Sequence, residues 1–410
     1  MKAFKIILVS FSFLVSSNIF AQSNTAIPML YLNPSPQLNG MGMVGTGLPT
    51  SDPFGFYYNP AQIGYNSQTT NFSLQFYPSK VNWLGLNVAS YNNLAFNAGY
   101  NFNNLLNGLS LSAGVGFIHS KMDYAGHLGP SSYPTSYVSY DEFNAYAFGV
   151  GIDYYAQLSL GLTYKKISSV LPVLPQMSTM KTFEANPTVF DYGLLLTVPV
   201  LKLIDPSFQL FNFKEMPAHP YFNFSIGYAR LNQGGEVAYI DQAQADPLPR
   251  TARLGYSIST GLDIAIKNTS LKFFDYSFTV DADDILIEPN STSYSYQSGI
   301  GDIQIGRNLI ELKSSDKVVV HKGHYFNFFE TFSLMIGRFD GNGYYSRKAS
   351  GWGVSAKGVL KMLKVNLDNN IVDYIADHFD VQYFSTILFQ DIQIETNLRS
   401  IGLNFTGFFF

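Results

Sequence analysis

The sequence contains no cysteine, and this absence removes several kinds of site at once. None of its 410 residues can form a disulfide, act as a thiolate nucleophile or supply a cysteine ligand to a metal. A lipid-modified N-terminal cysteine is excluded for the same reason. If the chain is exported, as its first residues indicate below, the lack of disulfides is consistent with a location in a bacterial envelope.

Charged residues are scarce as well. They make up 13% of the chain, about half the usual share of globular domains. The net charge is −4, and Lys and Arg occur singly or in pairs. Nucleic acids are bound by clustered basic residues, so we expect no nucleic-acid partner.

Long hydrophobic runs are missing from the mature chain. A membrane-spanning helix needs roughly 18 apolar residues, and the longest run, Tyr192–Ile204, is interrupted by Pro199 and Lys202. Aromatic residues nevertheless reach 16%, with 28 Tyr and 35 Phe, while all hydrophobic residues together make up 46%. This balance is typical of a transmembrane β-barrel, whose strands face lipid on one side and the lumen on the other.

The first 21 residues have the three parts of a secretory signal. Lys2 and Lys5 precede the apolar stretch Ile6–Val15, and small residues lead up to Ala21. We expect cleavage after Ala21, because the apolar run is too short for a retained membrane anchor. Export and composition together predict the outer membrane of a Gram-negative bacterium.

Residues 67–410 form a series of segments about ten residues long, bounded by Asn, Gly, Asp, Ser and Pro. In Tyr221–Tyr228, apolar side chains alternate with Asn, Ser and Gly, which is the period of an amphipathic strand. The fold class predicted is therefore all-β, a transmembrane antiparallel barrel. The expected strands are Thr70–Tyr77, Asn93–Phe102, Leu109–Met122, Phe143–Tyr155, Gln157–Ser168, Val189–Val198, Tyr221–Leu231, Thr251–Ile264, Leu271–Val280, Tyr325–Arg338, Gly351–Leu363, His378–Leu388 and Leu398–Phe410, with weaker ones in Val81–Ser90 and Ile300–Leu312 and a short helix at Asn370–Asp377.

The last strand ends in an aromatic cluster. Ile401, Leu403 and Phe405 alternate with small or polar residues, and the chain stops at Phe408-Phe409-Phe410. A closing amphipathic strand with a terminal aromatic resembles the signal that outer-membrane barrels present to their assembly machinery. Phe405, Phe408, Phe409 and Phe410 are therefore predicted to serve assembly, with outer-membrane lipid and the barrel assembly machinery as partners.

The segment Pro34–Gly64 differs from the rest of the chain. Six glycines and five prolines prevent a long helix or regular strand, and aromatic residues gather at Phe54–Tyr58. A glycine-rich segment with an apolar end, placed ahead of the strands, predicts a hatch folded inside the barrel. We assign residues 22–66 to this hatch and expect Asn59-Pro60-Ala61 to form a turn that pins it to the inner wall.

Glycine pairs also recur inside the strands, at Gly114 with Gly116 and at Gly149 with Gly151. They lack the third glycine and the following helix of a dinucleotide-binding motif. We interpret them as small residues at places where the wall curves or where a plug packs closely.

At the hatch the sequence resembles the N-terminal signature of FadL-like outer-membrane barrels, and most closely their PorV/PorQ branch. The residues that carry this resemblance are Gly40, Met41, Gly42, Asp52, Tyr58, Asn59, Pro60 and Ala61. Thr331–Arg338, Gly351–Gly358 and Phe379–Phe384 are similar to the closing strands of that branch. The resemblance implies about fourteen strands with the hatch inside the lumen. Thr46–Thr50 stands where the family often has an alanine-rich run.

Two main functions are implied by the resemblance. A PorV-like barrel would bind type IX secretion subunits or secreted cargo through long loops such as Ser131–Tyr140. A FadL-like barrel would pass hydrophobic small molecules such as long-chain fatty acids, with an apolar pocket lined by Met41, Met43, Phe54, Phe56 and Tyr57. A structural or porin-like barrel is the third alternative.

Catalytic and metal-binding patterns are incomplete. His321 and His324 are three residues apart, so on a strand they face opposite sides. Asp281, Asp283 and Asp284 lack the Gly and final Glu of a calcium loop, which favours solvated loop carboxylates. No Gly-x-Ser-x-Gly elbow occurs, and we expect no metal, no cofactor and no enzymatic activity.

Overall fold

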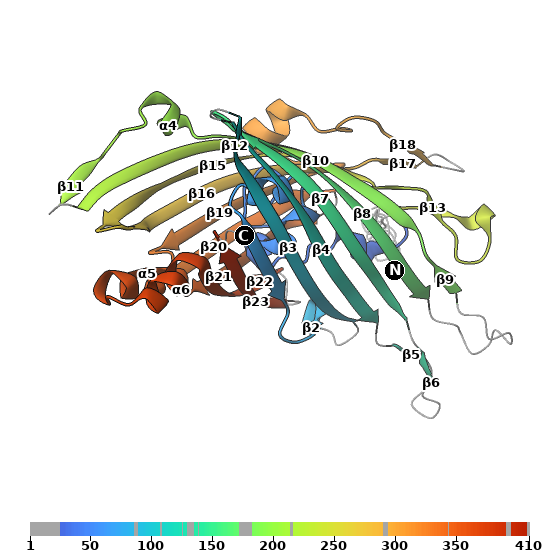
Figure 1. Ribbon diagram of the computed structural model, residues 1–410. Coiled ribbons are helices and arrows are strands. Elements are labelled where there is room, and N and C mark those ends of the chain that lie inside the picture. Colours follow the sequence, from blue (N-terminus) through green and yellow to red (C-terminus); the bar gives the residue numbers. More distant parts are fainter. Residues whose placement is uncertain are drawn as a thin grey trace, which may run out of the picture.

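The computed structural model describes residues 25–85, 89–106, 109–124, 126–128, 135–137, 139–171, 183–213, 216–289, 294–342, 344–390 and 395–407. The predicted signal peptide and Phe408-Phe409-Phe410 lie outside these residues. Within the described chain, fourteen strands pair antiparallel into one closed barrel around the N-terminal segment (Figure 1). They are β1 (Asn71–Phe76), β3 (Ala89–Leu106), β4 (Leu109–Tyr124), β7 (Tyr140–Asp153), β8 (Gln157–Leu171), β10 (Thr188–Val198), β12 (Met216–Gly234), β15 (Thr251–Ile266), β16 (Thr269–Ile285), β19 (Val318–Phe328), β20 (Phe332–Gly341), β21 (Tyr344–Ser355), β22 (Phe379–Leu388) and β23 (Thr396–Thr406).

The barrel closes where the first strand meets the last. Asn71 of β1 pairs with Thr406 of β23, and Phe76 pairs with Ile401. Closure satisfies the backbone hydrogen bonds of both edge strands. The predicted all-β barrel is confirmed.

Side chains alternate across the wall, as β8 illustrates. Leu158, Leu160 and Leu162 point outward and expose 37%, 47% and 60% of their surface, whereas Ser159 and Gly161 between them are buried. Most strands therefore have an apolar outer face and an inner face of small or polar residues. This is the arrangement of a barrel surrounded by lipid.

The shorter elements lie in the hatch and in the connections. The hatch contains η1 (Pro28–Tyr31), α2 (Pro36–Gly40), η2 (Pro53–Tyr57) and α3 (Gln62–Asn66). The connections contain β2 (Val81–Asn82), η3 (Trp83–Gly85), β5 (Gly126–Leu128), β6 (Thr135–Tyr137), β9 (Phe183–Ala185), α4 (Val200–Ile204), β11 (Phe211–Phe213), β13 (Glu236–Val237), η4 (Gln242–Gln244), β14 (Asp246–Pro247), β17 (Ile287–Pro289), β18 (Tyr294–Tyr296), η5 (Ile305–Ile310), α5 (Lys357–Asn366) and α6 (Asn370–His378). Among the helices that the structure describes, none is long and apolar enough to cross a membrane.

The two ends of the barrel differ. One end carries the tight turns between β7 and β8, β15 and β16, and β19 and β20, together with α4 and the pair α5 and α6. The other end carries the long connections, including the one between β16 and β19. We call these the turn end and the loop end. In outer-membrane barrels short turns face the periplasm and long loops face outward.

The structure corrects three predicted segments. Tyr325–Arg338 is two strands, because the chain reverses at Phe329 and Glu330, which both adopt positive φ. Turns of this backbone type usually contain Asn or Gly, so Phe329 and Glu330 carry no local turn signal. The expected strand Gly351–Leu363 ends at Ser355 and continues as α5. Ile300–Leu312 contains the π-helix η5, whose Leu309 packs with Val318 in a small core at the loop end.

The hatch runs through the lumen from one end to the other. The Ala26 amide donates to Pro247 O at the loop end (2.9 Å), and the Gly407 amide donates to Thr70 O at the turn end (2.7 Å). Between these points the hatch side chains form the main hydrophobic core together with inward-facing wall residues. The predicted placement of the N-terminal segment inside the barrel is confirmed.

Candidate functional site

Short capped turns define the shape of the hatch. Ser35 caps α2 by accepting a hydrogen bond from the Leu38 amide at 3.0 Å, and Asp52 caps η2 by accepting from the Phe54 amide at 2.8 Å. Gly42 and Met43 both adopt left-handed φ, at 80° and 68°. The chain therefore bends sharply after α2 and presents residues 42–47 to the barrel wall.

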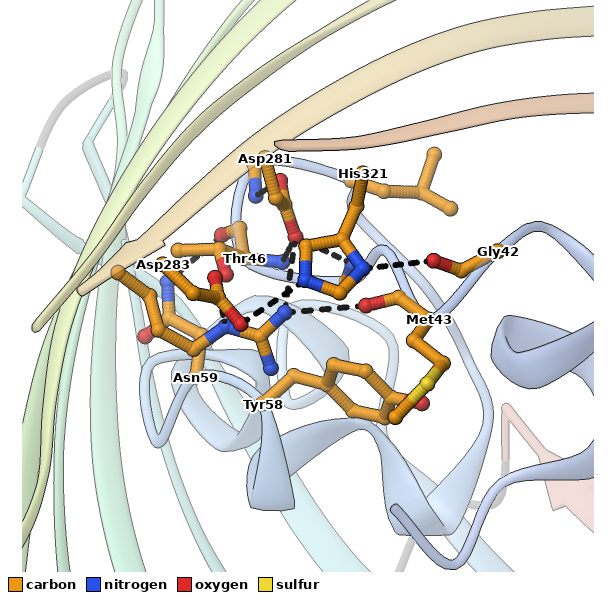
Figure 2. A network of polar contacts seen from close by, with 12 residues as sticks. Gly42, Met43, Thr46, Tyr58, Asn59, Asp281, Asp283 and His321 are labelled. Atoms are coloured by element: carbon orange, nitrogen blue, oxygen red, sulfur yellow. Dashed lines mark hydrogen bonds and ion pairs between the residues drawn. The ribbon is translucent and has the colours of Figure 1, made fainter. Parts of the chain in front are cut away.

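Asp281 of β16 holds this bend. Its Oδ2 accepts hydrogen bonds from the amides of Gly45 and Thr46 at 2.7 and 2.8 Å, and its Oδ1 accepts from the Gly47 amide at 3.4 Å. Figure 2 shows the carboxylate pointing from the wall into the loop. Successive backbone N–H groups form an anion-binding concavity, and here a carboxylate of the wall fills it.

Two further wall residues bind the carbonyl groups of the same bend (Figure 2). Arg253 of β15 donates to Met43 O at 3.0 Å, and His321 of β19 lies with its Nδ1 2.8 Å from Gly42 O. Asp283 joins them, because its carboxylate lies 2.8 Å from Arg253 Nε and 3.2 Å from His321 Nε2. We call Arg253, Asp281, Asp283 and His321, with the hatch residues they bind, the latch.

The latch is buried and its charges compensate one another. Arg253 exposes 3% of its surface and Asp281 none, and the two groups lie 3.6 Å apart. The guanidinium carbon also lies 4.9 Å from the ring centre of Tyr58. A buried ion pair is costly to break, since removing one partner leaves the other charge without compensation.

The latch corrects the interpretation of the carboxylates as solvated loop residues, which was wrong. β16 extends to Ile285, and Asp281 and Asp284 expose 0% and 2% of their surface. Asp281 and Asp283 lie beside Arg253, and Asp281 also accepts from the hatch amides, whereas Asp284 accepts a hydrogen bond from the Asp302 amide at 2.5 Å. Within the described residues, no three His, Cys, Asp or Glu side chains gather in a group that could hold a metal.

Asn59 provides the second attachment of the hatch. Its Nδ2 donates to Thr46 O and to Leu194 O of β10, both at 2.9 Å, while its Oδ1 accepts from the Ala61 amide at 3.0 Å. The side chain thus stabilises its own turn, the hatch loop and the wall. The structure shows the contact to the wall that the Asn59-Pro60-Ala61 turn was expected to make.

Gln62 connects the two halves of the hatch. Its amide group donates to Leu48 O at 2.6 Å and to Gly45 O at 3.2 Å, and it accepts from the Thr50 amide at 3.2 Å. Neither Gln62 nor Arg253 is among the site residues predicted from the sequence. The available signal for Arg253 was a charge among apolar and small residues of an expected strand, because such a charge must find a partner when it is buried.

Asp52 lies at the centre of the hatch. Burial raises the pKa of its carboxyl group to about 6, although hydrogen bonds from Ser35 Oγ and the Phe54 amide act in the opposite direction. The group therefore titrates close to neutral pH. The ionised form of Asp52 is stabilised by the Ser35 hydroxyl and the Phe54 amide, which donate to its carboxylate.

A band of glycines lets the hatch approach the wall. A Cβ atom added at Gly149 would lie 2.8 Å from Ile63 Cβ, and one added at Gly116 would lie 2.8 Å from a ring carbon of Phe56. An added Cβ at Gly337 would overlap the backbone of Met41. The interpretation that a plug packs closely against these glycines is confirmed. The glycines in this band are Gly114, Gly116, Gly149, Gly151, Gly161, Gly193, Gly227, Gly255, Gly323 and Gly337.

The residues predicted to line an apolar pocket lie against the protein itself. Met41, Phe54 and Phe56 expose none of their surface and Tyr57 exposes 2%, while Met43 is half-buried. Tyr57 stacks on Phe143 of β7, with ring centres 5.4 Å apart. A role in ligand binding stays a prediction for all five.

The remaining predicted residues fall into two places. Gly40 packs against β20 and β21, and Tyr58 donates a hydrogen bond to Asn39 at 3.1 Å. Phe405 lies at the closing seam, where it pairs with Phe72 and its ring contacts Phe379. Its role in assembly stays a prediction.

A second buried ion pair stands opposite the stacked aromatic rings. Lys165 Nζ lies 2.7 Å from Asp191, donates to Asn232 at 2.9 Å and sits 4.4 Å from the ring centre of Tyr57. Lys165 of β8 is therefore held by β10 and β12 and contacts one hatch residue, Tyr57. The inner wall binds the hatch through charge as well as through packing.

Comparisons with known proteins give distant structural likenesses. No family model matches the chain, and no curated protein matches it. The toluene transporter TodX of Pseudomonas putida is 10% identical with a TM-score of 0.37, covering 91% of this chain and 96% of its own. A FadL homologue of Pseudomonas aeruginosa is 8% identical with a TM-score of 0.37, and the match covers 91% of this chain and 96% of the homologue. The translocator domain of the autotransporter NalP of Neisseria meningitidis is 10% identical with a TM-score of 0.32, and the match covers 82% of this chain and 86% of that domain. The substrates and activities in these descriptions belong to those proteins.

Proposed function

We propose that this chain is an outer-membrane barrel of a Gram-negative bacterium that acts in protein secretion as a PorV/PorQ-type platform. Its lumen is closed by its own hatch, and its long loops bind secretion subunits or secreted cargo. The outward apolar face of strands such as β8 supports the membrane location. The PorV/PorQ assignment rests on the resemblance of the hatch sequence.

The observation that carries the platform proposal is the fixed hatch. A transport path for small molecules needs an opening, whereas here the latch, Asn59 and the glycine band attach the hatch on many strands. A closed barrel leaves its outer loops as the surface on which to act. We propose no enzymatic activity for it.

The test is recovery of partners from solubilised membranes. The full chain, purified with a mild cross-linker, is expected to bring along secretion-machinery subunits or cargo with a type IX C-terminal signal domain. Deletion of the gene is expected to reduce secretion of that cargo. Recovery of the barrel alone, with normal secretion in the deletion strain, would overturn the proposal.

A channel for hydrophobic small molecules is the second proposal, and the apolar core between the hatch and the wall favours it. η1 inserts Met29 and Leu30, both buried, into the aromatic core on the loop side of the hatch. Apolar side chains of the chain thus occupy a space that an apolar ligand could take if η1 moved out. Co-purified fatty acids or aromatic hydrocarbons, together with lost growth on such compounds after deletion, would favour this function over the platform.

A further inference from the structure

The helices α5 and α6 have their polar and apolar faces reversed relative to an ordinary surface helix pair. Val359, Met362 and Leu363 of α5 expose 50%, 48% and 42% of their surface. The side chains of Lys361 and Lys364, on the same helix, expose only 18% and 19%. Water-exposed helices show the opposite arrangement, with charge outward.

The lysines of α5 point toward the protein because they have partners there. Lys361 lies 2.6 Å from Glu330 in the turn between β19 and β20, and Lys364 lies 2.6 Å from Asp377 of α6. Lys267, in the turn between β15 and β16, donates to Val365 O at 2.7 Å. The hairpin is therefore fixed to two turns of the barrel through its polar face.

The second helix repeats the pattern. Ile371, Tyr374 and Ile375, at helical spacing i, i+3 and i+4, expose 70%, 52% and 37% of their surface. α5 and α6 pack against each other at the turn end of the barrel, beside β22 (Figure 1), and we call the six exposed apolar side chains of the two helices the apolar surface of the hairpin. Such exposed apolar faces mark contact with a partner or with a membrane.

This surface continues into the outer face of the barrel. α6 leads directly into β22, where Phe379 and Val381 point outward and expose 42% and 50% of their surface. The ring of Tyr374 contacts that of Phe379, with centres 6.2 Å apart. The outward apolar side chains of β22 therefore contact those of α6 at this junction.

We propose that the α5–α6 hairpin is an interfacial anchor whose apolar face lies in the acyl-chain boundary of the leaflet at the turn end. Lipid is the occupant chosen because the surface is continuous with the lipid-facing wall, and helices that lie in the interface bury an apolar face in this way. This inference rests on the membrane location proposed above. The hairpin would set the depth of the barrel at this rim.

The test uses tryptophan reporters in the full chain, reconstituted into phosphatidylcholine vesicles with brominated acyl chains. In a Trp83→Phe/Trp352→Phe background, Leu363→Trp reports on the hairpin, and Met362→Trp is a second reporter on the same face. Leu162→Trp reports on the barrel wall, and Ile240→Trp, in a loop-end connection, is the aqueous control. Bromine near the headgroup is expected to quench the hairpin reporters more than bromine near the chain end.

The outcomes separate this inference from the membrane location itself. If Leu162→Trp is quenched while both hairpin reporters behave like Ile240→Trp, the barrel is in the membrane but the hairpin is not, and the anchor is overturned. The anchor would also be overturned if the hairpin reporters became shielded from water only when another protein was added. If Leu162→Trp is not quenched, the membrane location fails first.

Discussion

Thr46 in the hatch and Asp281 in the barrel wall are 235 residues apart in sequence, yet the Thr46 amide donates to Asp281 Oδ2 at 2.8 Å. Gly45 donates to the same oxygen. One carboxylate thus fixes the hatch loop to β16 and also compensates Arg253. The predictions below follow from this attachment and from the contacts around it.

Replacing Asp281→Asn should release the hatch loop. The change removes the negative charge that the amides of Gly45 and Thr46 and the Arg253 guanidinium share, so the local cost should be roughly 3–5 kcal/mol. Hydrogen exchange of the residue 45–47 amides should accelerate in the folded barrel. Asp275→Asn is the matched control, because Asp275 lies on the same strand but binds Tyr221 of the wall at 2.6 Å. Equal exchange in the two variants would contradict the role of Asp281.

Replacing a glycine of the band by alanine should disturb the packing of the hatch against the wall, whereas the same change at a glycine outside the band should not. Gly337→Ala places a methyl group in the backbone of Met41, so the hatch must shift or the barrel must fold less well. In Gly402→Ala the nearest atom is Gln382 Cβ at 3.6 Å, an ordinary contact. Gel mobility of the folded barrel, with and without heating, measures the yield. If both variants fold alike and hold the hatch alike, close packing at Gly337 is not required.

Replacing Asn59→Ala should lower the stability of the folded barrel. It removes three hydrogen bonds. The carbonyls of Thr46 and Leu194 lose a donor, and the Ala61 amide loses an acceptor. We expect a loss of roughly 1–3 kcal/mol. Asn186→Ala is the control, since Asn186 also precedes a proline but is exposed and should change stability by less than about 0.5 kcal/mol. Thermal unfolding in detergent measures both, and similar values would contradict the attachment.

The pH dependence of stability should contain a contribution from Asp52. Burial raises its pKa to about 6 in the folded protein, against an ordinary value of 3.8 for an aspartate carboxyl group. The folded state therefore binds more protons between these values, and stability rises as the pH falls from 7 through 6 toward 4, by at most about 3 kcal/mol.

Asp52→Asn should remove this contribution. Comparing wild type with the variant at pH 7 and pH 5 cancels the other carboxylates, so the wild type should gain relative to the variant on acidification. A difference independent of pH, or one of opposite sign, would contradict the burial of an ionisable group at this position.

The sequence predicted the barrel because strand alternation is a local property. Phe222, Phe224 and Ile226 alternate with polar residues in any context, and the prolines and glycines of the hatch exclude regular elements wherever they lie. The turn at Phe329 and Glu330 was hidden because its residues are not turn formers. It is stabilised by tertiary contacts, among them the ion pair of Glu330 with Lys361.

The latch could not be predicted from local patterns. The local sequence around Asp281 and Asp283 is typical of a polar loop. Only the register of β16 against β15 and β19 turns these two side chains inward toward Arg253 and His321. The hatch motif indicated where the wall would be contacted, but not by which side chains. The sequence predicts that the strand continues through α5, because Val359, Met362 and Leu363 follow the alternating residues of β21.

The ion conductance of single barrels in a planar bilayer shows whether the hatch closes the lumen. We expect the full-length protein to stay closed at moderate voltage, while a chain that begins its mature part at residue 67 conducts steadily. Steady conductance of the full-length protein, equal to that of the truncated chain, would contradict the claim that the hatch is fixed in the lumen and closes it.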